Sequence, residues 1–232
     1  VHNEAKTVGR ILERIFTAPL PTGVVREVIV VDDCSVDGSV SILEALNRQG
    51  KFRLIRLDKN RGKGAALKAG LPHTKGDFIL IQDADEEYDP HQYEKLIAPI
   101  LSGKSQVVFG SRHLQQNMRN RYALGNIILT KIFNFLFGTK LTDVSTCYKI
   151  FPRSLVPMCV SIPHNDFVFD VCALTVVCVR NGYEIHEVAI SYVPRSHSQG
   201  KHMRVAHGIK ILTHMVRERI ATRHQNVDTK RT

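Results

Sequence analysis

Short runs of apolar, mostly β-branched residues recur along the first half of this chain, and segments with helical spacing lie between them. The clearest run is Glu-Val-Ile-Val-Val at residues 27–31. A continuous apolar run is typical of a strand that is buried on both faces of a sheet. Strands that alternate with helices in this way form a mostly parallel sheet flanked by helices, so we predict an α/β fold. The expected strands are residues 27–31, 52–57, 77–81 and 106–110, and the expected helices are 39–46, 64–71 and 91–101.

The second half of the chain has a different pattern. We expect an apolar helix at 122–138, a loop-like segment at 139–166, a helix at 167–181, an edge strand at 184–193 and a basic helix at 203–221. No repeat or low-complexity linker divides the 232 residues, of which 43% are hydrophobic and 23% are charged, as in ordinary globular proteins. We therefore predict one domain over residues 1–221, in which 116–221 elaborates the α/β half at 1–115, and a basic, disordered tail at 222–232.

The charge balance favours anionic partners. The chain has 32 Lys and Arg residues against 22 Asp and Glu residues, a formal net charge of +10. Nucleic acid, nucleotide phosphates and acidic membrane surfaces would all attract it, and charge alone does not choose among them. The five cysteines form no Cys-x-x-Cys pair and are expected to be reduced thiols of a cytosolic protein. No signal peptide or bilayer-spanning run is recognised, and the start at Val1 inside an expected strand suggests a missing N-terminal piece.

Polar clusters follow three of the expected strands at the points where they end. Ligands of open α/β sheets bind beyond the carboxyl ends of the strands, so we expect these clusters to meet at one edge of the sheet. A single Asp pair is equally well explained as a turn or a helix cap, and the interpretation therefore depends on the clusters occurring together. They are Asp32–Asp33, Gln82–Asp85 and Gly110–Arg112.

A divalent metal is the first ligand that these clusters predict. Asp83 and Asp85, with Glu87 two positions further on, offer the hard oxygen atoms that suit Mg²⁺ or Mn²⁺. Such a metal bridges nucleotide phosphates and neutralises the charge of a leaving diphosphate. Arg112 is expected to neutralise the same phosphates.

The segment Asn-Arg-Gly-Lys-Gly at residues 60–64 lies between an expected strand and an expected helix. Glycines permit close approach of a backbone, and the N-terminus of a helix attracts phosphate, which makes Lys63 a candidate phosphate ligand. Taken alone, a tight turn with a solvated lysine is the better explanation.

Several segments, in this order, resemble the motifs of the family 2 inverting glycosyltransferases, which have a Rossmann-like fold of GT-A type. They are Val1–Glu4, Val30–Gly38, Asn60–Gly64 and Gln82–Asp85. Later segments resemble the dolichyl- or polyprenyl-phosphate sugar transferases of that family: Gly110–Arg112, Leu141–Lys149, Glu187–Tyr192 and Arg195–Lys201. The resemblance implies a metal-dependent, inverting transfer of a sugar from a nucleotide diphosphate-sugar, of GDP-mannose or UDP-glucose type, to a polyprenyl or dolichyl phosphate.

The resemblance also implies roles for the matching residues. Donor contacts fall mainly in residues 1–115 and acceptor contacts in 116–221. The implied set is Glu4 and Asp33 for the nucleotide, Asp83, Asp85 and Glu87 for the metal and diphosphate, Lys63, Arg112, Arg195 and Lys201 for phosphates, and Asp83, Asp85, Arg112 and Asp170 for catalysis.

Two departures from the family pattern affect the mechanism. His2 replaces an aromatic residue in an opening that is shorter than the family's, which affects nucleotide affinity more than fold. Relatives commonly have Glu at the position of Cys172, so Asp170 is the acid that remains there. A sugar hydroxyl needs a general base, whereas a lipid phosphate is already an anionic nucleophile at neutral pH. The pattern favours the phosphate acceptor, with a sugar hydroxyl acceptor as the alternative.

The apolar helix at 122–137 has two explanations. Its apolar side chains lie near Arg119, Arg121 and Lys131, a pattern typical of a helix lying on an anionic membrane. The same side chains also suit a core helix. We expect a cytoplasmic protein, peripheral on the cytoplasmic face of a membrane, with the basic last helix extending the same surface.

Two other functional classes stay open. Val30–Asp33 followed by Asp83 is similar to the acidic pocket of a response-regulator receiver. A helix is expected before Val28, since Val8, Ile11, Leu12 and Ile15 have helical spacing, and this helix and the lack of a helix-turn-helix pattern weigh against that class. A non-catalytic sugar-nucleotide-binding protein is consistent with the short opening and Cys172. We do not expect a nucleic-acid partner, and the sequence does not reveal the sugar, the base, the lipid or the oligomeric state.

Overall fold

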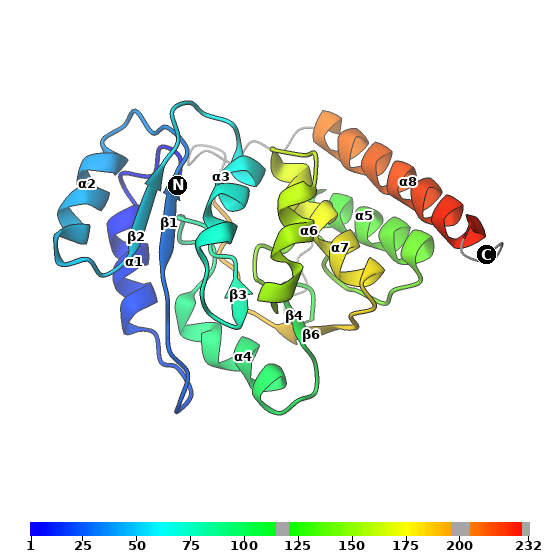
Figure 1. The fold of residues 1–232 in the computed structure, drawn as a ribbon, viewed down its shortest axis with the longest axis horizontal. Helices are drawn as coiled ribbons and strands as arrows, with labels where there is room; N and C mark the ends of the chain where they lie inside the picture. The colour runs from blue at the N-terminus through cyan, green and yellow to red at the C-terminus, as the bar shows by residue number, and fades with distance from the viewer. Residues whose placement is uncertain (115–120, 196–204, 229–232) are drawn as a thin grey trace.

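The computed structural model describes residues 1–114, 121–195 and 205–228. Its elements follow the expected alternation in the first half of the chain (Figure 1). The strands are β1 (Ile29–Asp32), β2 (Arg53–Arg56), β3 (Phe78–Leu80), β4 (Val107–Ser111), β5 (Lys149–Pro152) and β6 (Ile185–Ala189). The α-helices are α1 (Val8–Thr17), α2 (Ser39–Leu46), α3 (Lys63–Gly70), α4 (Tyr93–Leu101), α5 (Arg121–Phe137), α6 (Val156–Ser161), α7 (Leu174–Arg180) and α8 (Val205–Asp228), and a π-helical turn, η5 (Phe169–Ala173), precedes α7.

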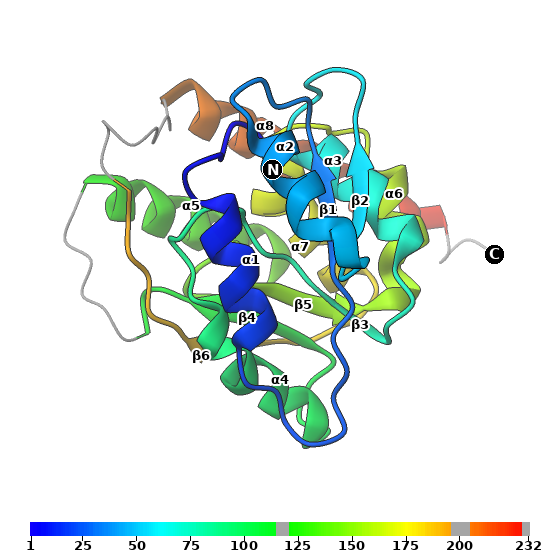
Figure 2. The ribbon, with the colours of Figure 1, turned by 90° about the vertical axis from the view of Figure 1, so that its left-hand side faces the viewer.

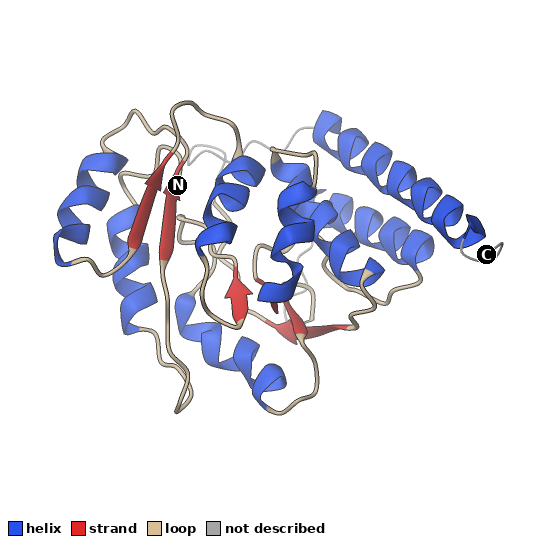
Figure 3. Ribbon diagram, viewed as in Figure 1, coloured by secondary structure: helices blue, strands red, loops and turns tan. Residues whose placement is uncertain are grey.

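The strands form two sheets (Figure 3). β1 pairs in parallel with β2, and the larger sheet has the order β3-β5-β4-β6. In the larger sheet β4 and β6 are parallel, whereas β5 runs antiparallel to both β3 and β4. The predicted α/β class is confirmed, and the arrangement differs from the expected one by the division into two sheets and by the insertion of β5.

β5 lies within residues 139–166, for which the sequence predicts a loop, and that prediction is wrong. The strand has four residues and begins at Lys149, whose side chain is completely buried. Its Nζ donates to the carbonyl oxygens of Thr146 and Asp170, at 2.6 and 2.5 Å. A charged residue is tolerated at this depth because its hydrogen bonds are made, which a hydrophobic pattern does not reveal.

Three apolar clusters hold the layers together. The largest surrounds the four-stranded sheet, α4 and α7. A second joins α5, η5 and α8, and a third lies where α1 and α2 pack on the small sheet. Figure 2 shows α1 and α2 in front of β1. The polar residues predicted from the sequence follow the carboxyl ends of β1 and β3.

Most of the predicted membrane-facing surface of α5 is core. Leu129 and Phe133 are buried, and Leu136 packs against the same cluster, which α8 covers. The outward side of the helix keeps a narrow row of exposed residues, which we call the α5 stripe. It consists of Leu124, Ile128, Lys131 and Phe135.

The last helix is longer than predicted. α8 continues to Asp228, so the tail that the sequence predicts from residue 222 begins inside this helix. Residues 229–232 lie outside the described part of the chain. None of the helices in the described ranges combines the length and the apolar character needed to cross a membrane.

Candidate functional site

The carboxylate of Asp33, at the end of β1, anchors the loop that follows β2. One oxygen accepts the backbone N–H of Arg61 and the other accepts that of Gly62, both at 2.8 Å. Asp33 is almost completely buried, and these two bonds give each of its carboxylate oxygens a hydrogen-bond partner. The predicted nucleotide contact of Asp33 is not tested by the structure, which gives this side chain a positioning role in the loop.

The glycines of this loop allow close contact with another part of the chain. A Cβ on Gly64 would lie 2.7 Å from the backbone oxygen of Asp166 and 2.7 Å from the Cβ of Phe169. The N–H of Ala65 donates to the oxygen of Asn165 at 2.8 Å. The sequence led us to expect that the backbone of this loop closely approaches a phosphate. In the structure it closely approaches residues 165–169 instead, and this contact places Lys63 beside Asp170.

Replacing Gly64 with alanine is expected to lower the free energy of unfolding by about 1–3 kcal/mol, as overpacking does. The new methyl group would meet Asp166 and Phe169 at 2.7 Å, so the start of α3 would shift. Gly125→Ala is the matched control, because a Cβ there meets nothing within 4 Å. Urea denaturation compares the two variants, and an unchanged midpoint for Gly64→Ala would show that this contact is loose.

Lys63 lies between two carboxylates. Its Nζ is 2.6 Å from Asp83 and 2.7 Å from Asp170, and it is 3.9 Å from the Sγ of Cys147. The Nζ of Lys149 is 3.7 Å from the other oxygen of Asp170. We call these five residues the Lys63 cluster. It unites the predicted phosphate ligand Lys63 with the predicted catalytic residues Asp83 and Asp170.

The ionisation of the Lys63 cluster is set by burial and by its ion pairs. Burial raises the pKa of Asp83, but the ammonium group of Lys63 outweighs burial, and the pKa lies below its usual value. Burial lowers the pKa of Lys63, yet Asp170 and Asp83 together bring it well above its usual value. The pKa of the Cys147 thiol is raised well above normal by burial, with Asp83 adding to the rise. Cys147 is therefore a neutral thiol at pH 7 and a poor nucleophile.

Arg195 joins the other predicted donor-site residues. It makes two bonds to the carboxylate of Glu4, at 2.9 and 2.8 Å, although the two residues are 191 positions apart. The same guanidinium lies 3.5 Å from Asp85, and the Arg195 N–H donates to Glu87 at 2.7 Å. Tyr192 donates to the second oxygen of Glu87 at 2.9 Å. We call Glu4, Asp85, Glu87 and Arg195 the Arg195 cluster. Lys201, predicted to act with Arg195, lies outside the described residues.

Arg112 has a partner that the sequence did not indicate. Its Nε and Nη2 donate to the two oxygens of Asp143, at 2.6 and 2.8 Å, and Asn126 donates to Asp143 at 2.7 Å. The guanidinium stacks on the ring of Tyr192 at 5.0 Å. The predicted phosphate ligand is thus largely engaged within the protein, one side chain away from Glu87. The polar Asn126 in an otherwise apolar helix was the available signal for this network.

Cys172 faces away from the site. It is completely buried in the apolar cluster with Phe133, Ile211 and Met215, and burial raises the pKa of its thiol to about 12. The side chain at this position, where relatives commonly have Glu, packs between α5 and α8. Asp170 is the acid of this turn that reaches the Lys63 cluster.

The predicted metal ligands do not converge on one point. Among the described residues, no group of three or more His, Cys, Asp and Glu side chains is arranged to hold a metal ion. Asp83 pairs with Lys63, and Asp85 lies near Arg195. Glu87 accepts from Tyr192 and Arg195 instead. The chemistry of Asp83 and Asp85 still fits a hard divalent cation, which would replace the two cationic partners.

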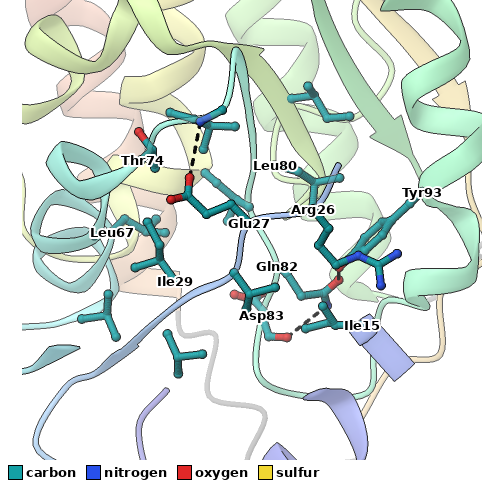
Figure 4. Close-up of a pocket in the computed structure, with 18 of the residues that line it drawn as sticks. Ile15, Arg26, Glu27, Ile29, Leu67, Thr74, Leu80, Gln82, Asp83 and Tyr93 are labelled. Carbon is teal, nitrogen blue, oxygen red and sulfur yellow. Dashed lines mark hydrogen bonds between the residues drawn. The ribbon is translucent and has the colours of Figure 1, made fainter. Parts of the chain in front are cut away.

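A cavity of about 1140 Å³ lies beside Asp83 and Asp85, which both line it. Its walls come from β1, β3, α1, α3 and α4. Figure 4 shows Asp83 and Gln82 beside apolar side chains that include Ile29, Leu67 and Leu80. Among the predicted site residues, Glu4, Asp33, Lys63, Asp83 and Asp85 line this cavity, whereas Arg112 and Arg195 do not.

Comparisons with known proteins point to one family. The family model of glycosyl transferase family 2 matches residues 1–157. The chain is 26% identical over 203 residues to an undecaprenyl-phosphate 4-deoxy-4-formamido-L-arabinose transferase of Shewanella sediminis, with 87% of this chain and 59% of that protein covered. It is 29% identical over 189 residues to a dolichyl-phosphate beta-glucosyltransferase of Saccharomyces cerevisiae, with 72% and 56% covered. The chain therefore spans less than two thirds of the length of either relative.

A solved structure has the same fold. The glucosyl-3-phosphoglycerate synthase of Mycobacterium tuberculosis, in complex with UDP, superposes with a TM-score of 0.70. The sequences are 18% identical, and the superposition covers 94% of this chain and 77% of that chain. This likeness bears on the fold, and it confirms the architecture predicted from the sequence.

Proposed function

The chain belongs to glycosyl transferase family 2, and from that premise we propose that it transfers a sugar from a nucleotide diphosphate-sugar to a polyprenyl phosphate. The observation that carries the proposal is that Lys63 and Asp83 of the Lys63 cluster and Glu4 and Asp85 of the Arg195 cluster line the same cavity. The names of the two sequence relatives, which act on undecaprenyl phosphate and dolichyl phosphate, support the acceptor class.

The donor diphosphate needs positive charge around it. The two clusters supply Lys63, Lys149 and Arg195, each already balanced by at least one carboxylate. A divalent metal, Mg²⁺ or Mn²⁺, held by Asp83 and Asp85 would offset the charge that develops on the leaving nucleotide diphosphate. With the metal bound, Lys63 would give up its contact with Asp83 and Arg195 its contact with Asp85, while Asp170 and Glu4 would still hold the two cations beside the phosphates.

The acceptor proposal follows from the surroundings of Asp170. This carboxylate is bound to Lys63 and lies close to Lys149, so it already balances two ammonium groups. A phosphate oxygen is charged at neutral pH and needs no base. In the proposed step this oxygen attacks the anomeric carbon, and the bond from that carbon to the nucleotide diphosphate breaks with inversion. Asp170 holds Lys63 in place during the step.

A transfer assay tests this proposal. The chain is incubated with labelled GDP-mannose, UDP-glucose or UDP-N-acetylglucosamine, a short-chain polyprenyl phosphate, and Mn²⁺ or EDTA. We expect label in the lipid with one donor, in the presence of metal and not with the corresponding polyprenol. Transfer to a sugar hydroxyl would favour the alternative acceptor, and donor binding without any turnover would favour a non-catalytic protein.

The α5 stripe supports the proposed peripheral membrane location. Replacing Phe135, whose side chain is 87% exposed, with serine is expected to reduce binding to anionic vesicles several-fold, because the interfacial anchor is lost. Val25→Ser is the matched control, since Val25 is 92% exposed but lies in the loop before β1. Flotation with phosphatidylserine vesicles measures both variants. Equal loss in both, or no binding by the wild type, would exclude the stripe as a membrane contact.

A further inference from the structure

The side chain of Gln82 stands at the beginning of the loop that carries the proposed metal ligands. Its Nε2 donates to the carbonyl oxygen of Asp83 at 3.0 Å and, in a longer bond of 3.5 Å, to that of Tyr88. These two carbonyls lie at the two ends of residues 83–88, which we call the acidic loop. One side chain therefore bonds both ends of the loop whose carboxylates are Asp83, Asp85, Glu86 and Glu87.

The oxygen of the same amide group is bound by two tyrosines. The hydroxyl group of Tyr93, the first residue of α4, donates to Oε1 at 2.9 Å, and that of Tyr148, directly before β5, donates at 2.8 Å. Figure 4 shows Gln82 beside Tyr93. Both rings are buried, and burial raises the pKa of both phenol groups, so they stay protonated and donate.

The orientation of the Gln82 amide group is fixed by these partners. A primary amide has two N–H donors and an oxygen that accepts twice, and all four positions are used. A carbonyl oxygen can only accept, so the nitrogen must face Asp83 and Tyr88 and the oxygen must face the two tyrosines. The side chain is thus a fixed link between the acidic loop, α4 and the start of β5.

The acidic loop needs such a link because its own carboxylates repel one another. Lys63 opposes that repulsion at Asp83, and the guanidinium of Arg195 lies near Asp85. In the proposed function both contacts are given up when the two carboxylates hold a divalent metal. The bonds of Gln82 go to backbone carbonyls, so they persist through that exchange of partners.

We propose that Gln82 is a positioning residue, which holds the acidic loop in the shape that binds a divalent metal. It acts through the carbonyls of Asp83 and Tyr88 and touches neither the metal nor the substrate. This role rests on the proposed function, in which Asp83 and Asp85 hold the metal. Groups that orient metal ligands without binding the metal themselves change metal affinity by a factor of about 10–100.

The variant Gln82→Met tests this role. Methionine is close to glutamine in size but makes none of the four bonds, so Tyr93 and Tyr148 lose their acceptor and the urea midpoint should fall. The dissociation constant for Mn²⁺ should rise about 10-fold. It is measured on the protein with Mn²⁺ alone, from the electron paramagnetic resonance signal of the free ion. Hydrogen exchange in residues 83–88 should become faster.

A triple variant separates positioning from stability. It combines Gln82→Met with Tyr93→Phe and Tyr148→Phe, so that no hydroxyl group is left without its acceptor. Replacing all partners of a buried hydrogen bond with apolar groups of the same shape is nearly neutral, and most of the lost stability should return. The weak Mn²⁺ binding and the fast exchange should persist, because the carbonyls of the acidic loop still lack their donor.

Gln92→Met is the matched control. Gln92 is also buried, but its amide group bonds to the backbone of Ser191, at 3.1 and 2.6 Å, and not to the acidic loop. This variant should lose stability and keep the Mn²⁺ affinity of the wild type.

Recovery of Mn²⁺ affinity together with stability in the triple variant would overturn the proposal, because Gln82 would then serve stability alone. Unchanged affinity in Gln82→Met, or an equal loss in Gln92→Met, would also overturn it. Sugar transfer by a wild type that binds no Mn²⁺ would overturn it and leave the transfer function intact. A wild type that binds Mn²⁺ and transfers no sugar would count against that function and leave the role of Gln82 to be decided by the variants' Mn²⁺ affinities.

Discussion

Replacing Lys63 with methionine is expected to destabilise the protein by about 3 kcal/mol and to abolish sugar transfer. Lys63 is the partner of both Asp83 and Asp170, and Asp170 is almost completely buried. Removing one partner of a buried ion pair leaves an uncompensated charge, which is strongly destabilising. Activity is lost because the same ammonium group is proposed to meet the donor phosphates. Urea denaturation and the transfer assay measure the two effects separately.

The pH dependence of this variant gives a sharper test. In the wild type the pKa of Asp83 is lowered, so its stabilising contribution is present above about pH 4 and is lost as pH falls through the folded pKa. The pKa of Lys63 is raised, so its contribution is present below about pH 10 and is lost only at higher pH. The ion pair between Lys63 and Asp83 therefore does not make the free energy of unfolding depend on pH between pH 5 and pH 8. In Lys63→Met the effect of burial on Asp83 is opposed only by the weaker effects of the Cys147 hydrogen bond and the Val1 ammonium group, so the pKa of Asp83 rises and this variant is expected to gain stability relative to the wild type as pH falls.

Two further variants control this experiment. Lys59→Met removes the same charge from an exposed position in the same loop, and it should leave stability within about 0.5 kcal/mol of the wild type. The double variant Lys63→Met with Asp170→Asn removes the more buried of the two carboxylate partners together with Lys63, and part of the lost stability should return without activity. The proposed role of the Lys63 ion pairs would be contradicted if Lys63→Met had the stability of the wild type and the same pH dependence of its free energy of unfolding between pH 5 and pH 8.

The strand ends were predictable from the sequence because their chemistry is local. The run before Asp33 and the run before Asp83 both indicate buried strands, and parallel strands bring their carboxyl ends to the same side of a fold. The family resemblance assigned Glu4 to the nucleotide and Arg195 to a phosphate, but it did not indicate their ion pair, and no local pattern connects residues so far apart. The meeting of Lys63 with Asp170 depends on Gly64, whose missing side chain permits the contact.

What the sequence did not predict depends on buried polar partners. Lys149 reads as a surface residue, yet it lies in a central strand because two carbonyl oxygens accept its hydrogen bonds. Arg112 reads as a free cation, yet Asp143 binds it through two hydrogen bonds. Cys172 comes two residues after Asp170 in η5, yet its side chain is buried in an apolar cluster with residues of α5 and α8. In each case the deciding partner is remote in sequence, and hydrophobic periodicity carries no information about it.

Replacing Asp85 with alanine is expected to reduce sugar transfer by a factor of about 10²–10³, the loss typical of removing one preorganised electrostatic group. The fold should survive, because Arg195 keeps its two bonds to Glu4 when the 3.5 Å contact with Asp85 is lost. The variant should also lose its response to metal, since Asp85 is a proposed ligand. EDTA is therefore expected to lower the rate of the wild type to that of Asp85→Ala and to leave the variant unchanged.

Glu86→Ala is the matched control, because Glu86 is the next residue in the same loop but forms an exposed ion pair with Arg10 at 2.6 Å. Exposed pairs of this kind contribute little to stability, so this variant should fold normally and keep both its transfer rate and its response to EDTA. Circular dichroism and urea denaturation establish that both variants are folded. A wild-type rate of sugar transfer in Asp85→Ala would show that the Arg195 cluster is not part of the donor site. An equal loss of sugar transfer in Glu86→Ala would instead show that any change in this loop impairs the site, since Glu86 pairs with Arg10 and is not proposed to contact the diphosphate or the metal.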